Sequence, residues 1–368
     1  MDSLLVYGSY GYTGRLIVHE AVRRGATPVV SGRSGRAVAT QAATLGLEGR
    51  VFTLEDTNLD EHIAPFDAVL NCAGPFTETA PDLVDACLET GTHYLDITGE
   101  FPVFERLRRR DEMAREHEVT LLPGVGFEVV PSDCLAAQLA CTLPNADELV
   151  LGIKGSPTVS RGTARTLLSL ASEGVVRRNG RLVSVPPAYR SRQIDFGDGL
   201  EPVVTAPWAD VVTAAHSTGI ETIDVYAAVP KVLEPGLSVG GIAGRVVDIP
   251  PVRGLLERGI DAFVTGPDER QRATDRAVVW GQAKATETGE VARGRLRTPN
   301  PYALTAKTAV DAAEGVLEGE RKPGFQTPAS AFGPEFAFEI EGVEYERLEM
   351  PETRDRTAGS SADVSERP

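Results

Sequence analysis

Three glycines at a regular spacing near the amino terminus carry the strongest chemical signal in the chain. Gly8, Gly11 and Gly14 follow an apolar run at residues 3–7 and open a segment with helical spacing. A glycine turn before a helix leaves backbone amides and the positive end of the helix dipole free to bind phosphate. The spacing differs from the dinucleotide fingerprint Gly-x-Gly-x-x-Gly at the middle glycine, so a strand-turn-helix unit without a nucleotide is the alternative. We expect a pyrophosphate to bind along Gly8, Ser9, Gly11, Tyr12, Thr13 and Gly14.

The second expected strand, at residues 27–31, ends in basic and hydroxyl residues instead of an acid. The chain continues as Gly32-Arg33-Ser34. An acid at this place would bind the ribose hydroxyls of NAD, whereas an arginine beside a hydroxyl suits a 2′-phosphate. The pattern therefore predicts NADP, bound by Arg33 and Ser34. An ordinary surface arginine in a strand-helix loop is the alternative.

Two further loops are expected to contact the cofactor. Asp56 follows the expected strand 50–54 and is placed to touch the adenine, although a polar loop residue needs no ligand. The segment Asn71-Cys72-Ala73-Gly74-Pro75-Phe76 follows the strand at 66–70. Ligands of such sheets lie beyond the carboxyl ends of the strands, so we expect nicotinamide contacts here. The residues expected to make them are Asn71, Ala73, Gly74 and Pro75, with Cys72 favoured as a packing residue.

The elements that would position these residues alternate between strand and helix. After the loops come a helix at 79–90, a strand at 93–97, a helix at 101–117 and a strand at 119–122. This order is typical of an α/β fold with a Rossmann-type doubly wound parallel sheet, which we assign to residues 1–133. The mixed charges of 101–117 indicate a solvated face and not a nucleic-acid patch.

The second half predicts an α+β domain over residues 134–350 that covers the substrate side. Its expected elements are a strand at 148–155, a helix at 162–173, a strand at 220–229 and an antiparallel pair at 277–286 and 290–297. An amphipathic helix at 301–317 belongs to a segment, 301–333, that is expected to pack back on the first domain. Residues 351–368 are polar without periodicity, which predicts a disordered tail.

The combination of motifs resembles one family, the saccharopine dehydrogenase-like oxidoreductases, which include the trans-acting enoyl reductases. The resemblance implies an NADP-binding Rossmann domain with a second α+β domain over the nicotinamide, and says little about the reaction. The middle of the chain is shorter than in animal members and lacks their long apolar segment. The matching stretches lie at 7–15, 31–33, 71–76, 91–96 with 99–100, 126–133, 304–309 and 324–333.

A hydride transfer to C=C or C=N also needs a proton source. By residue type the candidates are Asp210, His216, Tyr226 and Lys307. A polar helix-end position is the alternative for His216, and no catalytic residue of the family can be carried onto these positions.

Three functions stay open. The first is NADP-dependent reduction of a C=C or C=O group of an apolar acyl or isoprenoid-type substrate. The second is amino-acid oxidation or reduction at a C–N bond, which needs cations for several carboxylates, available as Lys154, Arg161 and Arg165. The third is non-catalytic NADP binding. The segment from Val203 to Ile249 holds only Lys231 and Arg245 as cations, so we favour the first function.

Composition limits the cellular setting. The chain has 37 Lys and Arg against 53 Asp and Glu, a net charge of −16, which disfavours nucleic acid and anionic membranes as partners. With only five lysines, the acidic surface predicts a halophilic protein, and an acidic mesophilic enzyme is the alternative. The first apolar strand begins by residue 3, so we expect no signal peptide. No apolar run is long enough to be a transmembrane segment, and we therefore expect a cytoplasmic protein.

The remaining expectations concern metal and assembly. The four cysteines form no Cys-x-x-Cys pair and the five histidines no His-x-x-x-His pair, so no metal site is expected. A small apolar substrate is the expected partner, and a homodimer is a further expectation.

The net charge of −16 predicts that the melting temperature rises with added KCl, well past the about 0.15 M at which ordinary screening is already short-ranged. Self-repulsion between carboxylates destabilises the fold in dilute buffer, and salt relieves it. A melting temperature that stays flat from dilute buffer to molar KCl, followed by circular dichroism, would favour the mesophilic alternative.

Overall fold

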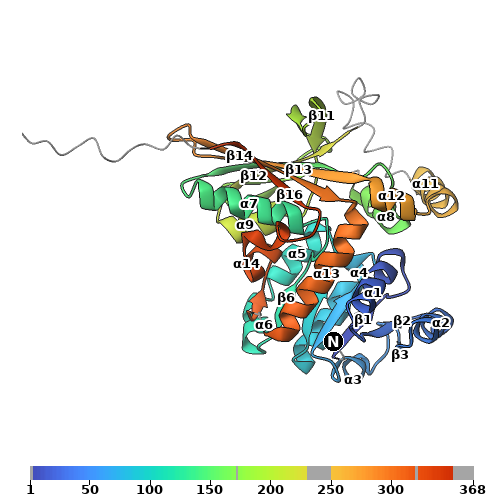
Figure 1. The fold of residues 1–368 in the computed structure, drawn as a ribbon. Coiled ribbons are helices and arrows are strands. Elements are labelled where there is room, and N and C mark those ends of the chain that lie inside the picture. Colours follow the sequence, from blue (N-terminus) through green and yellow to red (C-terminus); the bar gives the residue numbers. More distant parts are fainter. Residues whose placement is uncertain (1–2, 171–172, 230–249, 320–321, 351–368) are drawn as a thin grey trace, which may run out of the picture.

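Two β-sheets organise the chain, which the computed structural model describes over residues 3–170, 173–229, 250–319 and 322–350 (Figure 1). The first sheet is parallel, with the strand order β15-β6-β5-β4-β1-β2-β3. This confirms the α/β fold with a Rossmann-type sheet. Its strands are β1 (Leu4–Tyr7), β2 (Val29–Gly32), β3 (Gly49–Val51), β4 (Ala68–Asn71), β5 (His93–Asp96), β6 (Thr120–Leu122) and β15 (Gly324–Phe325).

Helices cover both faces of this sheet, which is why strands such as β1 and β4 are buried along their whole length. Apolar residues of one face pack with α1 (Tyr12–Arg23), α2 (Gly35–Leu45) and α13 (Pro301–Glu318). Those of the other face pack with α3 (Leu59–Ile63), α4 (Phe76–Thr90), α5 (Phe101–Arg108) and α6 (Asp111–Glu116).

The expectation of one helix over 101–117 was wrong, because the chain turns at Arg109–Arg110 and splits it into α5 and α6. The turn brings Asp111 to the edge of the first sheet. Its carboxylate accepts a hydrogen bond from the backbone amide of Phe325 in β15, at 2.8 Å. Asp111 and Phe325 are 214 residues apart in the sequence, so local periodicity could not reveal their contact.

The second sheet is mixed and has nine strands. Seven run in the order β10-β11-β12-β7-β13-β14-β16, and the hairpin of β8 and β9 pairs with β12. Their bounds are β7 (Glu148–Lys154), β8 (Val175–Arg178), β9 (Arg181–Ser184), β10 (Ser191–Asp195), β11 (Leu200–Thr205), β12 (Thr222–Ala228), β13 (Arg276–Lys284), β14 (Val291–Pro299) and β16 (Glu344–Glu349).

Helices α7 (Val130–Thr142) and α9 (Asp210–Thr218) lie between the second sheet and the first (Figure 1). The peripheral helices are α8 (Arg161–Leu170), α11 (Pro250–Phe263), α12 (Glu269–Thr274), α14 (Pro328–Phe332) and a 3-10 turn at Pro334–Ala337. In the part of the chain that the structure describes, no helix combines the length and apolarity needed to cross a membrane. Residues 351–368, Lys231 and Arg245 lie outside the described residues.

The chain crosses between the two sheets three times, the last time from β15 to β16. It leaves the first sheet after β6 and enters α7 at Val130, three residues before the expected boundary. It returns through α13, which runs along α1, and β15 then pairs with β6 (Figure 1). An arginine at the end of α1 strengthens this return: Arg24 binds Asp311 and Glu314 of α13 as well as Glu20 of its own helix.

Replacing Arg24 with methionine is expected to lower the free energy of unfolding by about 1–2 kcal/mol, because Asp311 and Glu314 would then lose their shared cation beside Glu20. Urea unfolding at low salt measures the change. Arg23→Met is the matched control, since the Arg23 side chain is 67% exposed and, among the described residues, forms an ion pair only with Glu20 of its own helix. Equal losses in the two variants would contradict a role for Arg24 in holding α13 on α1.

Candidate functional site

The turn between β1 and α1 has the shape of a phosphate cradle. Gly8 has a φ of +75°, and a Cβ there would lie 2.8 Å from Ala73. A Cβ at Gly14 would lie 2.5 Å from the carbonyl oxygen of Gly8. No side chain caps α1 at Gly11, so the amides of its first turn are left for an external anion. The turn therefore fits a pyrophosphate.

Side chains in this turn bind other parts of the protein. The hydroxyl of Ser9 is buried and donates to Oε1 of Gln41 on α2, at 2.7 Å. The Tyr12 hydroxyl donates to the carbonyl of Pro267, and its ring meets Tyr302 edge-on at 5.0 Å. Thr13 lies in the first turn of α1 and is half-buried. The backbone of these residues, more than their side chains, is available to a cofactor.

The carboxyl ends of β1 to β3 form the expected adenosine side. Arg33 is exposed. Burial raises the pKa of the Tyr7 hydroxyl to about 12, and the positive charge of Arg33 acts on this pKa in the opposite direction. Asp56 accepts hydrogen bonds from the amide and hydroxyl of Thr53, at 2.9 and 2.8 Å, and these lower its pKa. Since Asp56 also acts on the pKa of Tyr7, it shares this side of the sheet with Arg33.

Ser34 is the N-cap residue of α2. Its hydroxyl caps the helix at Ala37, and its amide donates to the Tyr10 hydroxyl at 3.2 Å. The Tyr10 ring covers Gly32, where a Cβ would lie 2.6 Å from a ring carbon. Ser34 is therefore held at the start of a groove between α1 and α2.

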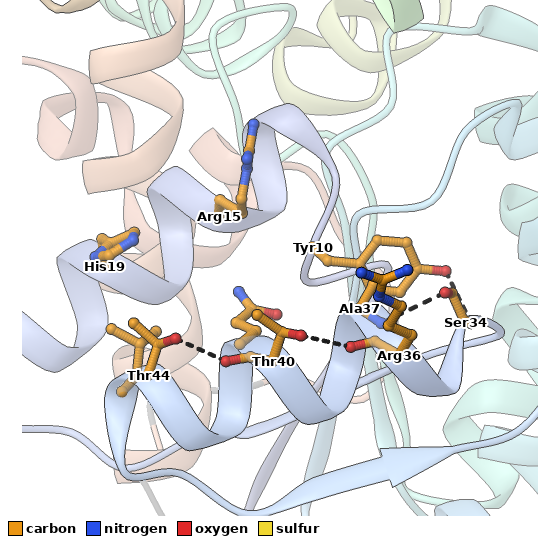
Figure 2. A pocket seen from close by; sticks show the side chains of 10 residues that line it. Tyr10, Arg15, His19, Ser34, Arg36, Ala37, Thr40 and Thr44 are labelled. Atoms are coloured by element: carbon orange, nitrogen blue, oxygen red, sulfur yellow. Dashed lines mark hydrogen bonds between the residues drawn. The ribbon is translucent and has the colours of Figure 1, made fainter.

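That groove has a volume of about 550 Å³ (Figure 2). It is lined by Tyr10, Arg15, His19, Ser34, Arg36, Ala37, Thr40, Gln41, Thr44 and Leu45. Arg15 and Arg36 are exposed, and neither forms an ion pair within the described residues. Sequence reasoning did not single out these two arginines, although Arg36 stands only two positions beyond Ser34. Two unpaired cations beside a helix amino terminus could hold a phosphate.

The loop after β4 lies at the expected nicotinamide end. Asn71 is fully buried, donates to Thr79 and to the Tyr94 hydroxyl, and accepts from the Ala73 amide, so its side chain orders the loop. Gly74 and Pro75 are exposed and are joined by a cis peptide bond. Burial raises the pKa of the Cys72 thiol far above its usual range, which makes this thiol unreactive.

Carboxyl groups dominate the ends of β5 and β6. Glu100 accepts hydrogen bonds from the amides of Phe76 and Thr77, at 3.1 and 3.0 Å, and so caps α4. Asp96 accepts from the amides of Thr98 and Gly124, yet burial raises its pKa to about 7. The amino terminus of α4 is thus filled by a carboxylate of the protein, whereas that of α1 is not.

Glu128 is a candidate site residue that sequence reasoning missed. Every residue from Val119 to Ala137 is buried except Glu128, which is partly accessible. Its side chain lies against Gly99 at the end of β5, where a Cβ would be 2.9 Å from the Cβ of Glu128. Burial raises its pKa to about 7. The available signal was a single acid inside the apolar segment Gly126-Phe127-Glu128-Val129-Val130.

The four candidate proton donors are not brought together. Asp210 begins α9 and is fully buried; burial raises its pKa, and the charge of nearby Glu128 raises it further. His216, at the other end of α9, packs edge-on against Phe325. Tyr226 lies under Arg192 in a separate apolar cluster of the second sheet. Lys307 pairs with Glu341 at an exposed position.

The three cations considered for substrate carboxylates all have partners inside the protein. Lys154 binds Glu201 at 2.6 Å, and Arg165 binds Asp261 at 2.5 Å. Arg161 donates to the carbonyl oxygen of Val264 at 2.7 Å. No group of three or more His, Cys, Asp or Glu side chains suited to a metal occurs among the residues that the structure describes.

Sequence comparison finds relatives of this chain among NADP-binding oxidoreductases. A family model for the NADP-binding domain of saccharopine dehydrogenase matches residues 4–122. A saccharopine dehydrogenase-like oxidoreductase of Bos taurus is 33% identical over 152 residues, covering 35% of each chain. The chain thus matches about a third of the length of this relative. A Mycobacterium tuberculosis protein provisionally named a trans-acting enoyl reductase is 27% identical over 327 residues, covering 73% of this chain and 77% of that protein.

The fold has a solved counterpart. Apo saccharopine dehydrogenase (L-Glu forming) from Saccharomyces cerevisiae superimposes with a TM-score of 0.62 at 13% identity, covering 95% of this chain and all of that chain. The aligned region, 95% of this chain, takes in both the parallel sheet and the second mixed sheet. In the sequence of residues 4–122 and in its fold, this chain is similar to the saccharopine dehydrogenase-like oxidoreductases.

Proposed function

We propose that this protein is an NADPH-dependent reductase of a C=C or C=O group in an apolar acyl or isoprenoid-type substrate. The observation that carries this choice is the pairing of Lys154, Arg161 and Arg165 with other parts of the protein. A substrate with several carboxylates would need free cations when buried, and these three are engaged. The name of the mycobacterial relative, an enoyl reductase, points to the same reaction class.

The charges near the expected nicotinamide end support a substrate without carboxylates. Asp96, Glu100, Glu128, Asp133 and Asp210 gather around the ends of β5 and β6 and the starts of α7 and α9. None of the five forms an ion pair within the described residues. These acids offer no positive charge to a substrate carboxylate, whereas an apolar chain gains about 25 cal/mol per Å² that it buries.

NADPH is the proposed cofactor and, when bound, supplies the hydride. Its pyrophosphate would lie at the uncapped amino terminus of α1, and its 2′-phosphate near Arg33, Ser34 and Arg36. These positions lie along one edge of the sheet, beyond the carboxyl ends of β1 and β2, where dinucleotides bind in this fold.

Replacing Arg33 with aspartate is expected to weaken NADPH binding roughly 10- to 150-fold and to spare NADH, because a charge-assisted hydrogen bond of about 1.5–3 kcal/mol is lost. Titration of the cofactor's fluorescence measures both constants. Arg109→Asp, the same charge change at an exposed residue that follows α5, is the control. Equal affinities of the unaltered protein for NADPH and NADH would contradict the choice of cofactor.

The substrate class is tested by following NADPH absorbance with a long-chain trans-2-enal and a trans-2-enoyl thioester. We expect oxidation of NADPH by at least one of them and no formation of NADPH from saccharopine with NADP⁺. Arg165→Ala should leave the reduction unchanged, since Arg165 is already paired with Asp261. Robust oxidation of saccharopine would favour the amino-acid alternative, and cofactor binding without turnover of any acceptor would favour a non-catalytic NADP-binding protein.

A further inference from the structure

Glu128 occupies a position that the packing of the chain does not explain. It is an acid in the linker between β6 and α7, where each neighbour from Val119 to Ala137 is buried. A buried polar residue with a structural task has hydrogen-bond partners, as Asp96 and Glu100 have. Within the described residues, neither a hydrogen bond nor an ion pair holds the Glu128 carboxyl.

The surroundings fix Glu128 by its backbone and leave the carboxyl free. The indole nitrogen of Trp208 donates to the Glu128 carbonyl oxygen at 2.7 Å. The amide of the preceding residue, Phe127, donates to the Thr305 hydroxyl of α13 at 3.0 Å. The side chain lies against Gly99, which follows β5. Because the nicotinamide end of a dinucleotide reaches this part of the sheet edge, the free carboxyl lies at the reacting end of the site.

Burial is what favours the protonated form of Glu128, and two titratable neighbours respond to its charge. Asp210 of α9 and Tyr302 of α13 are close enough for their protonation to depend on it. Asp133 of α7 acts in turn on the pKa of Asp210, and no cation pairs with Glu128 in the described part of the chain. The carboxyl therefore keeps its proton into the neutral range, with a pKa of about 7.

We propose that Glu128 is the proton donor of the reduction. This inference rests on the proposed function. As the substrate carbon accepts the hydride, the electron pair of its C=O or C=C bond moves to the neighbouring oxygen or carbon. That atom takes the proton from Glu128, so the carboxyl O–H bond breaks and a new O–H or C–H bond forms. The carboxylate left behind lies beside the oxidised, positively charged cofactor and is reprotonated from solvent after the oxidised cofactor leaves.

The proposal predicts a proton exchange that requires no substrate. The positive nicotinamide of NADP⁺ stabilises the Glu128 carboxylate, whereas NADPH has a neutral nicotinamide. Binding of NADP⁺ near pH 7 should release about half a proton more than binding of NADPH, because about half of Glu128 is then protonated. The 2′-phosphate, whose pKa is about 6, titrates equally in both cofactors and cancels in the difference.

Isothermal titration calorimetry in buffers of different ionisation enthalpy measures the protons released by each cofactor. In the unaltered protein, NADP⁺ should release more protons than NADPH, and its affinity relative to NADPH should rise up to about tenfold from pH 6 to pH 8. Glu128→Gln should abolish both differences while it still binds NADPH, which shows that the variant is folded. Glu128→Asp should restore part of the proton release.

Asp210→Asn is the matched control, because Asp210 is a neighbouring buried acid. It should retain the proton release. The proposal is overturned if Glu128→Gln releases as many protons as the unaltered protein, or if only Asp210→Asn abolishes the release. Failure to bind either cofactor would instead overturn the proposed function. With an accepted enal, Glu128→Gln should lower kcat about 10²- to 10⁴-fold, with little change in KM.

Discussion

The contact between α13 and the loop after β6 is the constraint on which the site depends. Two threonines of α13 bind this loop: the Thr305 hydroxyl accepts from the Phe127 amide, and the Thr308 hydroxyl donates to the carbonyl of Val125 at 2.8 Å. Gly126 has no room for a side chain, since a Cβ would lie 2.8 Å from Thr305. A helix from the end of the chain thus determines the path by which the chain leaves the first sheet, and with it the position of Glu128.

Electrostatics at the two ends of the sheet edge are opposite in character. The adenosine end offers unpaired arginines and an uncapped helix, in a chain whose net charge is −16. The other end collects carboxyls without cations, of which Asp96 and Glu128 have pKa values raised to about 7 by burial. A dinucleotide has the same polarity, with its phosphates toward one end and a ring that becomes cationic on oxidation at the other.

The sequence predicted the parts of the fold that short-range patterns determine. The glycine turn, β1, α1 and the absence of an acid after β2 all lie within a few residues of one another, and their chemistry is local. The split of α5 from α6 depends on the contact of Asp111 with β15. Lys154 is not free to bind a substrate carboxylate because it pairs with Glu201. Such long-range pairs leave no periodic trace. Glu128 is visible in the sequence as an acid in an apolar segment, but its position in the site depends on Gly99, Trp208 and α13.

Tyr12 joins the phosphate-binding turn to the second half of the chain. Its ring contacts Tyr302 at the start of α13, and its hydroxyl bonds to Pro267 and Arg272 near α12. The first turn of α1 is therefore part of the interface between the two sheets. The angle between the sheets cannot change without disturbing these contacts, so domain orientation and anion affinity at this turn are thermodynamically coupled, and each must respond to the other.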